Sequence, residues 1–290
     1  SIICMTGRRG KFIPLMLLLH RLCFLFFFFF ICHISVCAQE KDIFRVMFWN
    51  VENLFDTERD SLKQDDEFLP ASIRGWHRGR YKKKIADVSR VITATGEWES
   101  PALVGLCEVE NDRVLRDLTR YSPLKAYDYG YVMTESADLR GIDVALLYRK
   151  DCFKLLTDTF IRPDMGPDER PTRDILHATG LLLTRDTLDV FVVHLPSRSG
   201  GAKASEPKRL RVARILKEAV DSLTCIRQYP RILIMGDFND YPDDKSITGI
   251  LKVRSLDDQV DQSKLYHLLS RKVVIENKKR ENKRNGMGYG

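Results

Sequence analysis

The chain has 290 residues, a formal net charge of +7 and seven cysteines. Four of the positive charges and four of the cysteines lie within the first 38 residues. The remaining chain of about 250 residues is therefore only mildly basic, and it is long enough for one domain with a sizeable core. Cys107, Cys152 and Cys225 remain in that part and are far apart in sequence, which excludes a disulfide framework and argues against a zinc site.

The first 38 residues have the pattern of a secretory signal peptide. Basic residues at positions 8, 9 and 11 precede an apolar stretch at 23–32, and Val36-Cys37-Ala38 supplies small residues at a cleavage point. The apolar stretch is shorter than the roughly 20 residues that span a bilayer. We therefore expect export to the periplasm or the extracellular space without stable membrane insertion after cleavage. A retained membrane anchor is the alternative if the segment is not cleaved.

Apolar patterning predicts alternating strands and helices over residues 39–290, which we interpret as one domain. Helices are expected around Ile85, Val88 and Ile92, after a possible N-cap at Asn111, and over residues 213–223. Strands are expected, in chain order, at residues 43–49, 103–107, 144–148, 177–183, 188–194 and 232–235.

Several strands between residues 144 and 194 follow one another with no helix between them. A doubly wound sheet with strict alternation would not have this pattern. The order instead favours an α/β (α+β) fold in which two mixed β-sheets form a sandwich with helices on its outer faces, giving four layers.

Polar side chains recur where the apolar strands end. Asp237 and Asn239 follow the strand 232–235 and lie two residues apart, so in extended backbone both side chains leave on the same side. Similar polar groups end three other strands: Asn50 and Glu52 follow the strand 43–49, Glu108 follows 103–107, and His194 ends 188–194. Together the four strand ends indicate one site along a common sheet edge.

These motifs resemble the endonuclease/exonuclease/phosphatase superfamily, which includes deoxyribonuclease I, exonuclease III and the neutral sphingomyelinases. The resemblance covers residues 43–240, and the opening motif at residues 50–56 (Asn-Val-Glu-Asn-Leu-Phe-Asp) is most similar to its secreted bacterial branch. It implies a Mg²⁺-dependent hydrolase of phosphodiester or phosphomonoester bonds, with Mn²⁺ as a possible substitute. Nucleic acid is the commonest substrate in the family; lipid head groups and inositol or sugar phosphates are the alternatives. We expect a monomer.

The resemblance assigns a role to each motif. Glu108 matches the principal metal ligand, with Asn50 and Glu52 as its neighbours around the ion. His194 matches the histidine that hydrogen-bonds the scissile phosphate. Asp237 and Asn239 match the pair that orients the attacking water and stabilises the transition state.

Elementary chemistry agrees with these roles. Phosphodiester hydrolysis places charge on phosphate oxygens, which a hard cation held by carboxylates neutralises, and a carboxylate can accept a proton from water. His194, if protonated, would donate to the phosphate or the leaving group. Each assignment has a structural alternative. Glu108 would cap the following helix, Glu52 and Glu110 would be surface carboxylates, and His194 would be an ordinary histidine at a sheet edge.

Three further segments carry less specific signals. Arg173 precedes a strand and is placed either to clamp a substrate phosphate or to form an ion pair with a nearby aspartate. Asp143 is interpreted either as a support for the site or as a turn residue. The polar loop 197–201 suits the rim of a substrate groove. The basic runs 78–84 and 278–284 are interpreted as solvated surface or as contacts to a phosphate backbone.

The sequence departs from the family pattern after Leu251. Family members end in a late strand that carries an Asp-His pair, and no such pair follows here; His267 comes after Tyr266 and has no adjacent aspartate. We therefore expect a domain that is incomplete at its C-terminus and lacks its last strands. The alternative function is a binding module that keeps the fold without the chemistry.

Overall fold

The computed structural model describes residues 44–96, 99–255, 258, 261 and 263–268. The predicted signal peptide at 1–38 and the basic run 278–284 lie outside these residues. Among the described helices, none has the length and hydropathy needed to cross a membrane.

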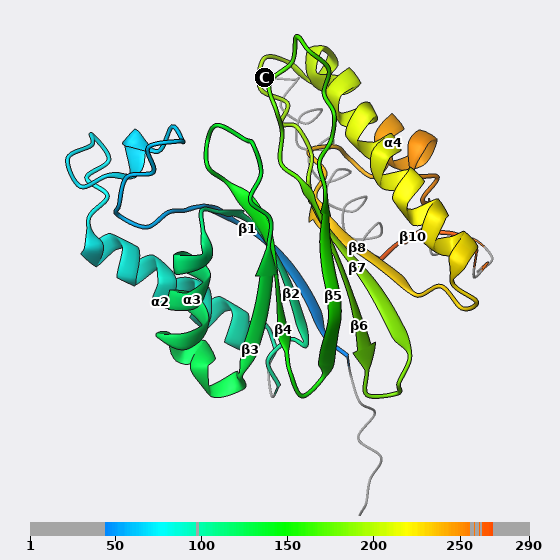
Figure 1. Cartoon of the computed structure of the whole chain (residues 1–290), viewed down its shortest axis with the longest axis horizontal. Coiled ribbons are helices and arrows are strands. Elements are labelled where there is room, and N and C mark those ends of the chain that lie inside the picture. Colours follow the sequence, from blue (N-terminus) through cyan, green and yellow to red (C-terminus); the bar gives the residue numbers. More distant parts are fainter. Residues whose placement is uncertain (1–43, 97–98, 256–257, 259–260, 262, 269–290) are drawn as a thin grey trace, which may run out of the picture. The chain divides into compact units, whose positions relative to one another are not determined.

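The first sheet, sheet A, has four strands in the order β1-β2-β4-β3 (Figure 1). Strands β1 (Val46–Leu54) and β2 (Leu103–Val109) are parallel. Strands β4 (Asp143–Arg149) and β3 (Tyr129–Met133) complete the sheet with antiparallel pairings. The sheet is therefore mixed.

The second sheet, sheet B, has the order β5-β6-β7-β8. Strands β5 (Phe153–Ile161), β6 (Ile175–Leu182) and β7 (Thr187–His194) pair with one another in that order, and both pairings are antiparallel. Strand β8 (Ile232–Asp237) then lies parallel to β7. In each sheet one parallel pair brings two strand ends to the same edge, which is where polar side chains from distant parts of the chain can meet.

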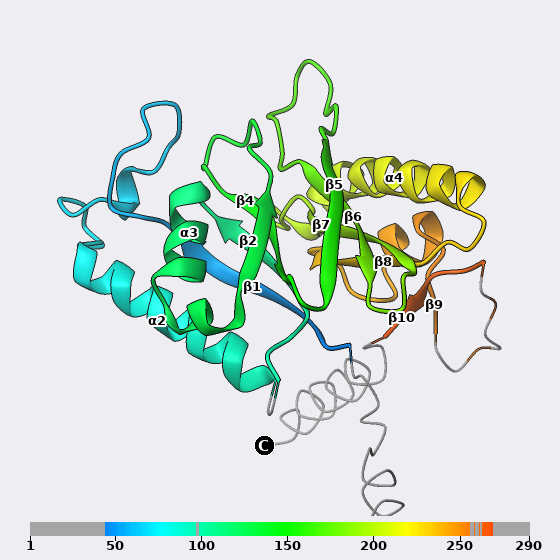
Figure 2. The same ribbon diagram turned by 60° about the horizontal axis from the view of Figure 1, so that its bottom comes forward.

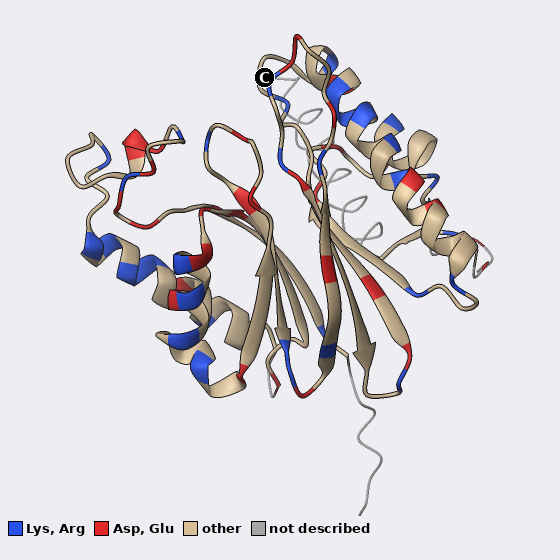
Figure 3. Ribbon diagram, viewed as in Figure 1, with Lys and Arg blue, Asp and Glu red and all other residues tan. Residues whose placement is uncertain are grey.

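Helices cover the outer faces of both sheets (Figures 1 and 2). Helices α2 (Arg78–Thr95) and α3 (Asp112–Arg120) pack on sheet A, and α4 (Ala202–Ile226) packs on sheet B. Short elements complete the described chain: η1 (Asp66–Phe68), η2 (Pro123–Tyr127), η3 (Ser246–Ile250), β9 (Arg254–Ser255) and β10 (Tyr266–His267). Many lysine and arginine positions lie on the outer helices, whereas the strands carry few charged residues (Figure 3).

Three apolar clusters hold these layers together. One lies between α2, α3 and sheet A, and a second lies between sheet B and α4. The third joins the inner faces of the two sheets through side chains such as Leu103, Cys107, Leu146, Val190 and Met235. This arrangement confirms the predicted sandwich of two mixed sheets with helices outside.

Most predicted elements are present, with boundaries extended by a few residues. Ile85, Val88 and Ile92 are buried on α2, and the Asn111 side chain accepts a hydrogen bond from the Val114 N–H at 3.1 Å, which confirms the helix N-cap. Strands β3 and β5 are absent from the sequence prediction. Both lie at sheet edges. Strand β5 is mostly exposed after Phe153 and lacks the apolar pattern of a half-buried strand, and β3 is only five residues long.

Candidate active site

Asn50, where the regular pairing of β1 with β2 ends, joins the polar strand ends of the two sheets. Its Nδ2 donates to Glu108 Oε1 at 3.3 Å on sheet A and to Asp237 Oδ2 at 3.1 Å on sheet B. The local pairing explains this geometry, because Asn50 is in register with Cys107 on β2, next to Glu108. The structure therefore brings together three of the residues predicted to form one site.

Sheet A presents its site residues through an irregular backbone. The β2–β4 register shifts between Cys107 and Val109, which leaves Glu108 at a bulge with a φ of 64°. Glu52 and Asn53 also have positive φ values, of 54° and 63°. Side chains other than glycine pay for this conformation with strain, which is typical of functional sites.

Sheet B presents Asp237 and Asn239 from the end of β8. Asp237 is in register with His194 on the parallel strand β7. The Asn239 N–H donates to Asp237 Oδ1 at 2.9 Å, and Asn239 Nδ2 donates to the Leu195 carbonyl at 2.9 Å. Both oxygens of the Asp237 carboxylate therefore accept hydrogen bonds, and Asn239 is fixed against the residue that follows His194.

His194 is buried at the same strand edge. Burial, followed by the positive charges of Arg173 and Arg140, lowers the pKa of His194 to about 2. The imidazole of the free protein is therefore neutral near pH 7, so the condition for donation by a charged His194 is not met there. Its Nδ1 atom is buried and has no hydrogen-bond partner in the structure.

Arg173 forms the predicted alternative, an ion pair. Its NH1 donates to Asp138 Oδ2 at 3.1 Å and its NH2 donates to the Leu195 carbonyl at 2.7 Å. Both charged side chains are only 7% exposed, while Arg173 Nε is buried without a partner. Arg173 thus holds the backbone of Leu195, the residue after His194, and its positive charge acts on the imidazole.

Glu52 takes part in the site through its backbone. Its N–H donates to Asn50 Oδ1 at 2.9 Å, whereas its side chain is exposed. Lys84 on α2 donates to the carbonyls of Glu52 and Asn53. Burial lowers the pKa of Lys84, and the nearby carboxylates of Glu52 and Glu108 oppose that shift. Lys84 is therefore a cation close to the sheet A carboxylates, and only its position within the basic run 78–84 hinted at this.

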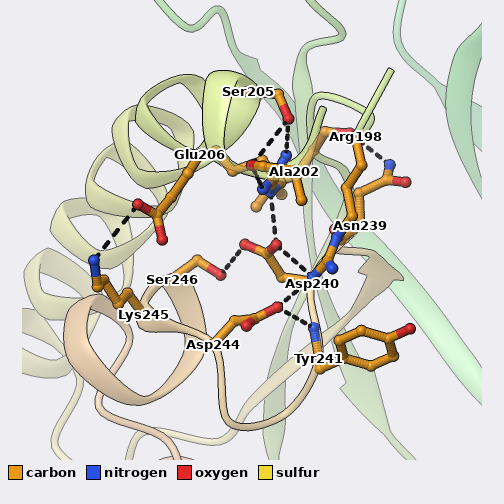
Figure 4. Close-up of polar contacts among 12 residues, drawn as sticks. Arg198, Ala202, Ser205, Glu206, Asn239, Asp240, Tyr241, Asp244, Lys245 and Ser246 are labelled. Atoms are coloured by element: carbon orange, nitrogen blue, oxygen red, sulfur yellow. Dashed lines mark hydrogen bonds and ion pairs between the residues drawn. The ribbon is translucent and has the colours of Figure 1, made fainter. Parts of the chain in front are cut away.

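A buried polar cluster braces the loop that follows Asp237 (Figure 4). Asp240 Oδ1 accepts from Arg209 Nε at 2.7 Å and from Arg198 NH2 at 3.0 Å, and Asp240 Oδ2 accepts from Ser246 Oγ at 2.6 Å. Arg198 also donates to the Asn239 carbonyl at 2.6 Å and pairs with Asp244. Arg209 and Asp240 are almost fully buried. The cluster therefore ties the Asp237–Asn239 loop to α4.

Two other acidic residues, Asp143 and Glu110, form hydrogen bonds that hold loop segments in place. Asp143 is buried and accepts hydrogen bonds from Thr134 Oγ1 at 2.6 Å and from the Ser136 N–H at 2.9 Å, so it organises the β3–β4 loop. Glu110 is half-buried and accepts from the Asp56 N–H at 2.6 Å. Burial is the main cause that raises the pKa of Glu110 to about 8, with nearby aspartates adding to it.

A groove of about 360 Å³ lies beside the strand ends. The predicted rim loop lines it through Ser197, Ser199 and Gly200, and so does Arg173. Positive side chains from three separate segments also line it, namely Arg140, Arg170 and Lys208. The groove is therefore suited to an anionic ligand.

The oxygen atoms at the strand ends match the ligands of a hard divalent cation. Glu108 and Asp237 supply the carboxylates, the Asn50 amide nitrogen bridges them, and the Asn50 amide oxygen accepts from the Glu52 N–H. Hard divalent cations take carboxylate oxygens. The two carboxylates therefore fit a hard divalent cation.

Comparison with known proteins agrees with this architecture. A family model described as "Endonuclease/Exonuclease/phosphatase family" matches residues 45–283. The chain belongs to this family, whose members include hydrolases of phosphate esters. No curated protein matches the chain significantly.

One solved structure supports the fold, and two others show weaker similarity. The chain is similar to a mannosyl-6-phosphatase of Bacteroides thetaiotaomicron, with 16% identity, a TM-score of 0.51, and coverage of 72% of this chain and 70% of that one. It is also similar to D. rerio TDP2 humanized by 14 mutations, with 16% identity, a TM-score of 0.47, and coverage of 71% of this chain and 65% of that one. For the human Nocturnin catalytic domain with bound sulfate, the identity is 17%, the TM-score is 0.45, and the coverage is 70% of this chain and 67% of that one. The chain thus spans 65–70% of the length of these three structures.

Proposed function

We propose that this protein is a divalent-metal-dependent phosphoesterase that uses Mg²⁺, with Mn²⁺ as a substitute, and that nucleic acid is its principal substrate. The observation that carries this proposal is the contact of one Asn50 amide with the carboxylates of Glu108 and Asp237. Carboxylates from two sheets share this one donor, which supports a site where both act on one ion and its bound water.

The metal would be held by Glu108, with Asn50 and Asp237 beside it, and the exposed Glu52 is proposed as a further ligand. A bound Mg²⁺ supplies positive charge that neutralises the phosphate oxygens as they become more negative. Glu108 is positioned for this by its bulge, which turns the residue out of the regular strand pattern. Lys84 adds a second positive charge near the same carboxylates.

Asp237 is the proposed general base. Its two oxygens are oriented by the Asn239 N–H and by the Asn50 amide, so the carboxylate cannot rotate freely. A positioned carboxylate accepts a proton from the attacking water and contributes roughly 10²–10⁴-fold to the rate. Asn239 orients the water together with Asp237.

His194 is proposed to bind the scissile phosphate as a neutral imidazole. A neutral ring has one N–H donor and one acceptor nitrogen. Because burial, Arg173 and Arg140 keep it uncharged, it contributes a directed hydrogen bond. Arg140 and Arg170, which line the adjacent groove, supply the positive charge for the phosphate. Arg173 can join them only if it leaves Asp138.

The test of the proposed function is hydrolysis of a generic phosphodiester and a generic phosphomonoester before and after EDTA treatment. We expect EDTA to abolish turnover and Mg²⁺ to restore it. Glu108→Gln should remove turnover in the presence of Mg²⁺, whereas the exposed Glu218→Gln on α4 should have no effect. Turnover that resists EDTA, or a fully active Glu108→Gln variant, would refute the metal assignment. Metal binding without any turnover would support the binding module instead.

The groove supports a second candidate substrate, a compact phosphorylated head group. Its volume of about 360 Å³ falls in the range of small-ligand pockets. The two candidate substrates are distinguished by how DNA affinity depends on salt and by how activity depends on polymer length. A nuclease should lose DNA affinity steeply with rising salt, since phosphate contacts release counterions. A head-group phosphatase should be indifferent to polymer length.

Export is proposed from sequence alone, with residues 1–38 as a cleaved signal and residues 39–290 as the enzyme domain. N-terminal sequencing of secreted material tests this proposal. A first residue at or near position 39 supports it, and an intact N-terminus favours the membrane-anchored alternative.

A further inference from the structure

A thiol lies next to the proposed catalytic groups and has no role in the hydrolysis described above. Cys107 on β2, His194 on β7 and Asp237 on β8 each place one ligand atom such that all three atoms are within 4.8 Å of one another. Cys107 and His194 are buried, and Asp237 is partly exposed. The group therefore has an opening toward solvent on the Asp237 side.

The surroundings of these atoms leave them available for a ligand. His194 Nδ1 is buried and has no hydrogen-bond partner, which is costly for a polar atom unless something else occupies the site. The Cys107 thiol is not part of a disulfide. The thiol must release its proton when a metal binds.

The chemical class of these ligands differs from that of the oxygen-only group around Glu108. Sulfur and imidazole nitrogen select borderline-soft metals, whereas Mg²⁺ prefers oxygen. Zinc takes thiolate, imidazole and carboxylate at about 2.0–2.3 Å, and three protein ligands with one open position form a familiar zinc geometry. Separations below 4.8 Å require only small side-chain movements to reach such a centre.

We propose that Cys107, His194 and Asp237 form an inhibitory binding site for a thiophilic divalent metal, with Zn²⁺ as the reference ion. The site shares Asp237 with the oxygen group that Asn50 joins, so the two metals compete for one carboxylate. Zn²⁺ would also occupy His194. The spacing of the cysteines does not reveal such a site, because its ligands come from three strands in two sheets.

Co²⁺ serves as the spectroscopic probe, added alone to the full-length chain in buffer without Mg²⁺. Tetrahedral Co²⁺ with a thiolate ligand absorbs strongly in the visible and shows a thiolate charge-transfer band, whereas Co²⁺ in an oxygen-only octahedral site absorbs weakly. We expect both strong features at one equivalent, and we expect Zn²⁺ to remove them. Cys107→Ser should lose the charge-transfer band, and the matched Cys225→Ser, at an exposed thiol on α4, should keep it.

The cysteines at positions 4, 23, 32, 37 and 152 stay in every variant, so that their contribution is common to all spectra. Cys107→Ala provides a second variant if the serine hydroxyl disturbs folding, which far-UV circular dichroism checks. His194→Gln should weaken Co²⁺ binding. Absence of the thiolate band in the wild type, or its persistence in both folded Cys107 variants, would overturn the proposal.

Inhibition is a second readout, and it rests on the proposed function. Zn²⁺ should inhibit Mg²⁺-supported hydrolysis by the wild type, and Cys107→Ser should require at least ten-fold more Zn²⁺, since loss of even an outer partner typically costs about 10–100-fold in metal affinity. Equal Zn²⁺ sensitivity of the two proteins would contradict the site. If the Co²⁺ spectrum appears but no substrate is hydrolysed, the metal site stands and the proposed function fails.

Discussion

The two sheets hold their site residues by different physical means. Sheet A relies on backbone conformation, with Glu52, Asn53 and Glu108 in the left-handed region. Sheet B relies on buried ion pairs, in which Asp240 is bound by arginines beside the loop that carries Asp237. Asn239 on the sheet B side also has a positive φ, of 50°, but asparagine tolerates this conformation better than glutamate.

This difference predicts how each half responds to mutation. A residue change at one strained position on sheet A should alter local strain directly. On sheet B, removal of a distant partner on α4 should disturb the active-site loop. The chain thus reaches one functional geometry through a strained bulge on one side and a desolvated charge network on the other.

The largest effect is expected from removing the charge that the sheet B network positions. Asp237→Asn keeps the size of the side chain and should lower kcat by about 10²–10⁴-fold, because the amide cannot accept the proton of the attacking water. Steady-state kinetics with saturating Mg²⁺ measures this, with the exposed Asp221→Asn on α4 as the control. Activity within two-fold of the wild type would remove Asp237 from the mechanism.

The second prediction tests the brace itself. Arg209→Met should destabilise the protein by about 3 kcal/mol in urea unfolding, since breaking a buried pair leaves an uncompensated charge. Lys217→Met on the same helix breaks a more exposed pair with Asp221 and should cost less than about 1 kcal/mol. Similar costs for the two variants would mean that the ion pairs on sheet B do not hold the loop.

The third prediction concerns pH and sheet A. Burial raises the pKa of Glu110 to about 8, so between pH 4.5 and 8 the folded protein keeps a proton that the unfolded chain releases. Stability should therefore fall as pH rises through this window. The Glu110→Gln variant should not show this loss of stability. At pH 8 it should be more stable than the wild type by about 1–2 kcal/mol, a value reduced to account for screening by solvent. Thermal unfolding at pH 5 and pH 8 measures it, and parallel pH dependence of both proteins would contradict it.

The smallest effect compares glycine with alanine at one position in each sheet. At position 108, Glu108→Gly should be more stable than Glu108→Ala by about 1 kcal/mol, because only glycine adopts a positive φ without strain. At position 237 the order should reverse, with Asp237→Ala more stable than Asp237→Gly by about 0.5–1 kcal/mol. The same order at both positions would show that sheet A is not strained at its bulge.

Much of this architecture follows from the sequence. The apolar runs of β2, β7 and β8 and the buried faces of α2 and α4 are periodic, and the polar residues that end the strands lie where a sheet edge needs them. The edge strand β5 escapes prediction because its exposure removes the apolar alternation that marks a strand, whereas β3 is only five residues long.

The site is only partly predictable, for a related reason. Asn50, Glu108 and Asp237 follow apolar runs, so their convergence is readable from strand order. The supporting residues Arg209 and Lys84 lie on helices, and their partners depend on how those helices pack. The neutral state of His194 likewise depends on burial and on Arg173, which no local pattern shows.

The central claim is that Glu108 and Asp237, from two different sheets, bind one ion. A double-mutant cycle on Mn²⁺ affinity tests it most directly, with Glu108→Gln, Asp237→Asn and the double variant measured by titration calorimetry. If one ion is shared, the two losses should be non-additive, with a coupling energy of about 1 kcal/mol or more. Losses that add to within about 0.5 kcal/mol would show two independent carboxylates and contradict the account.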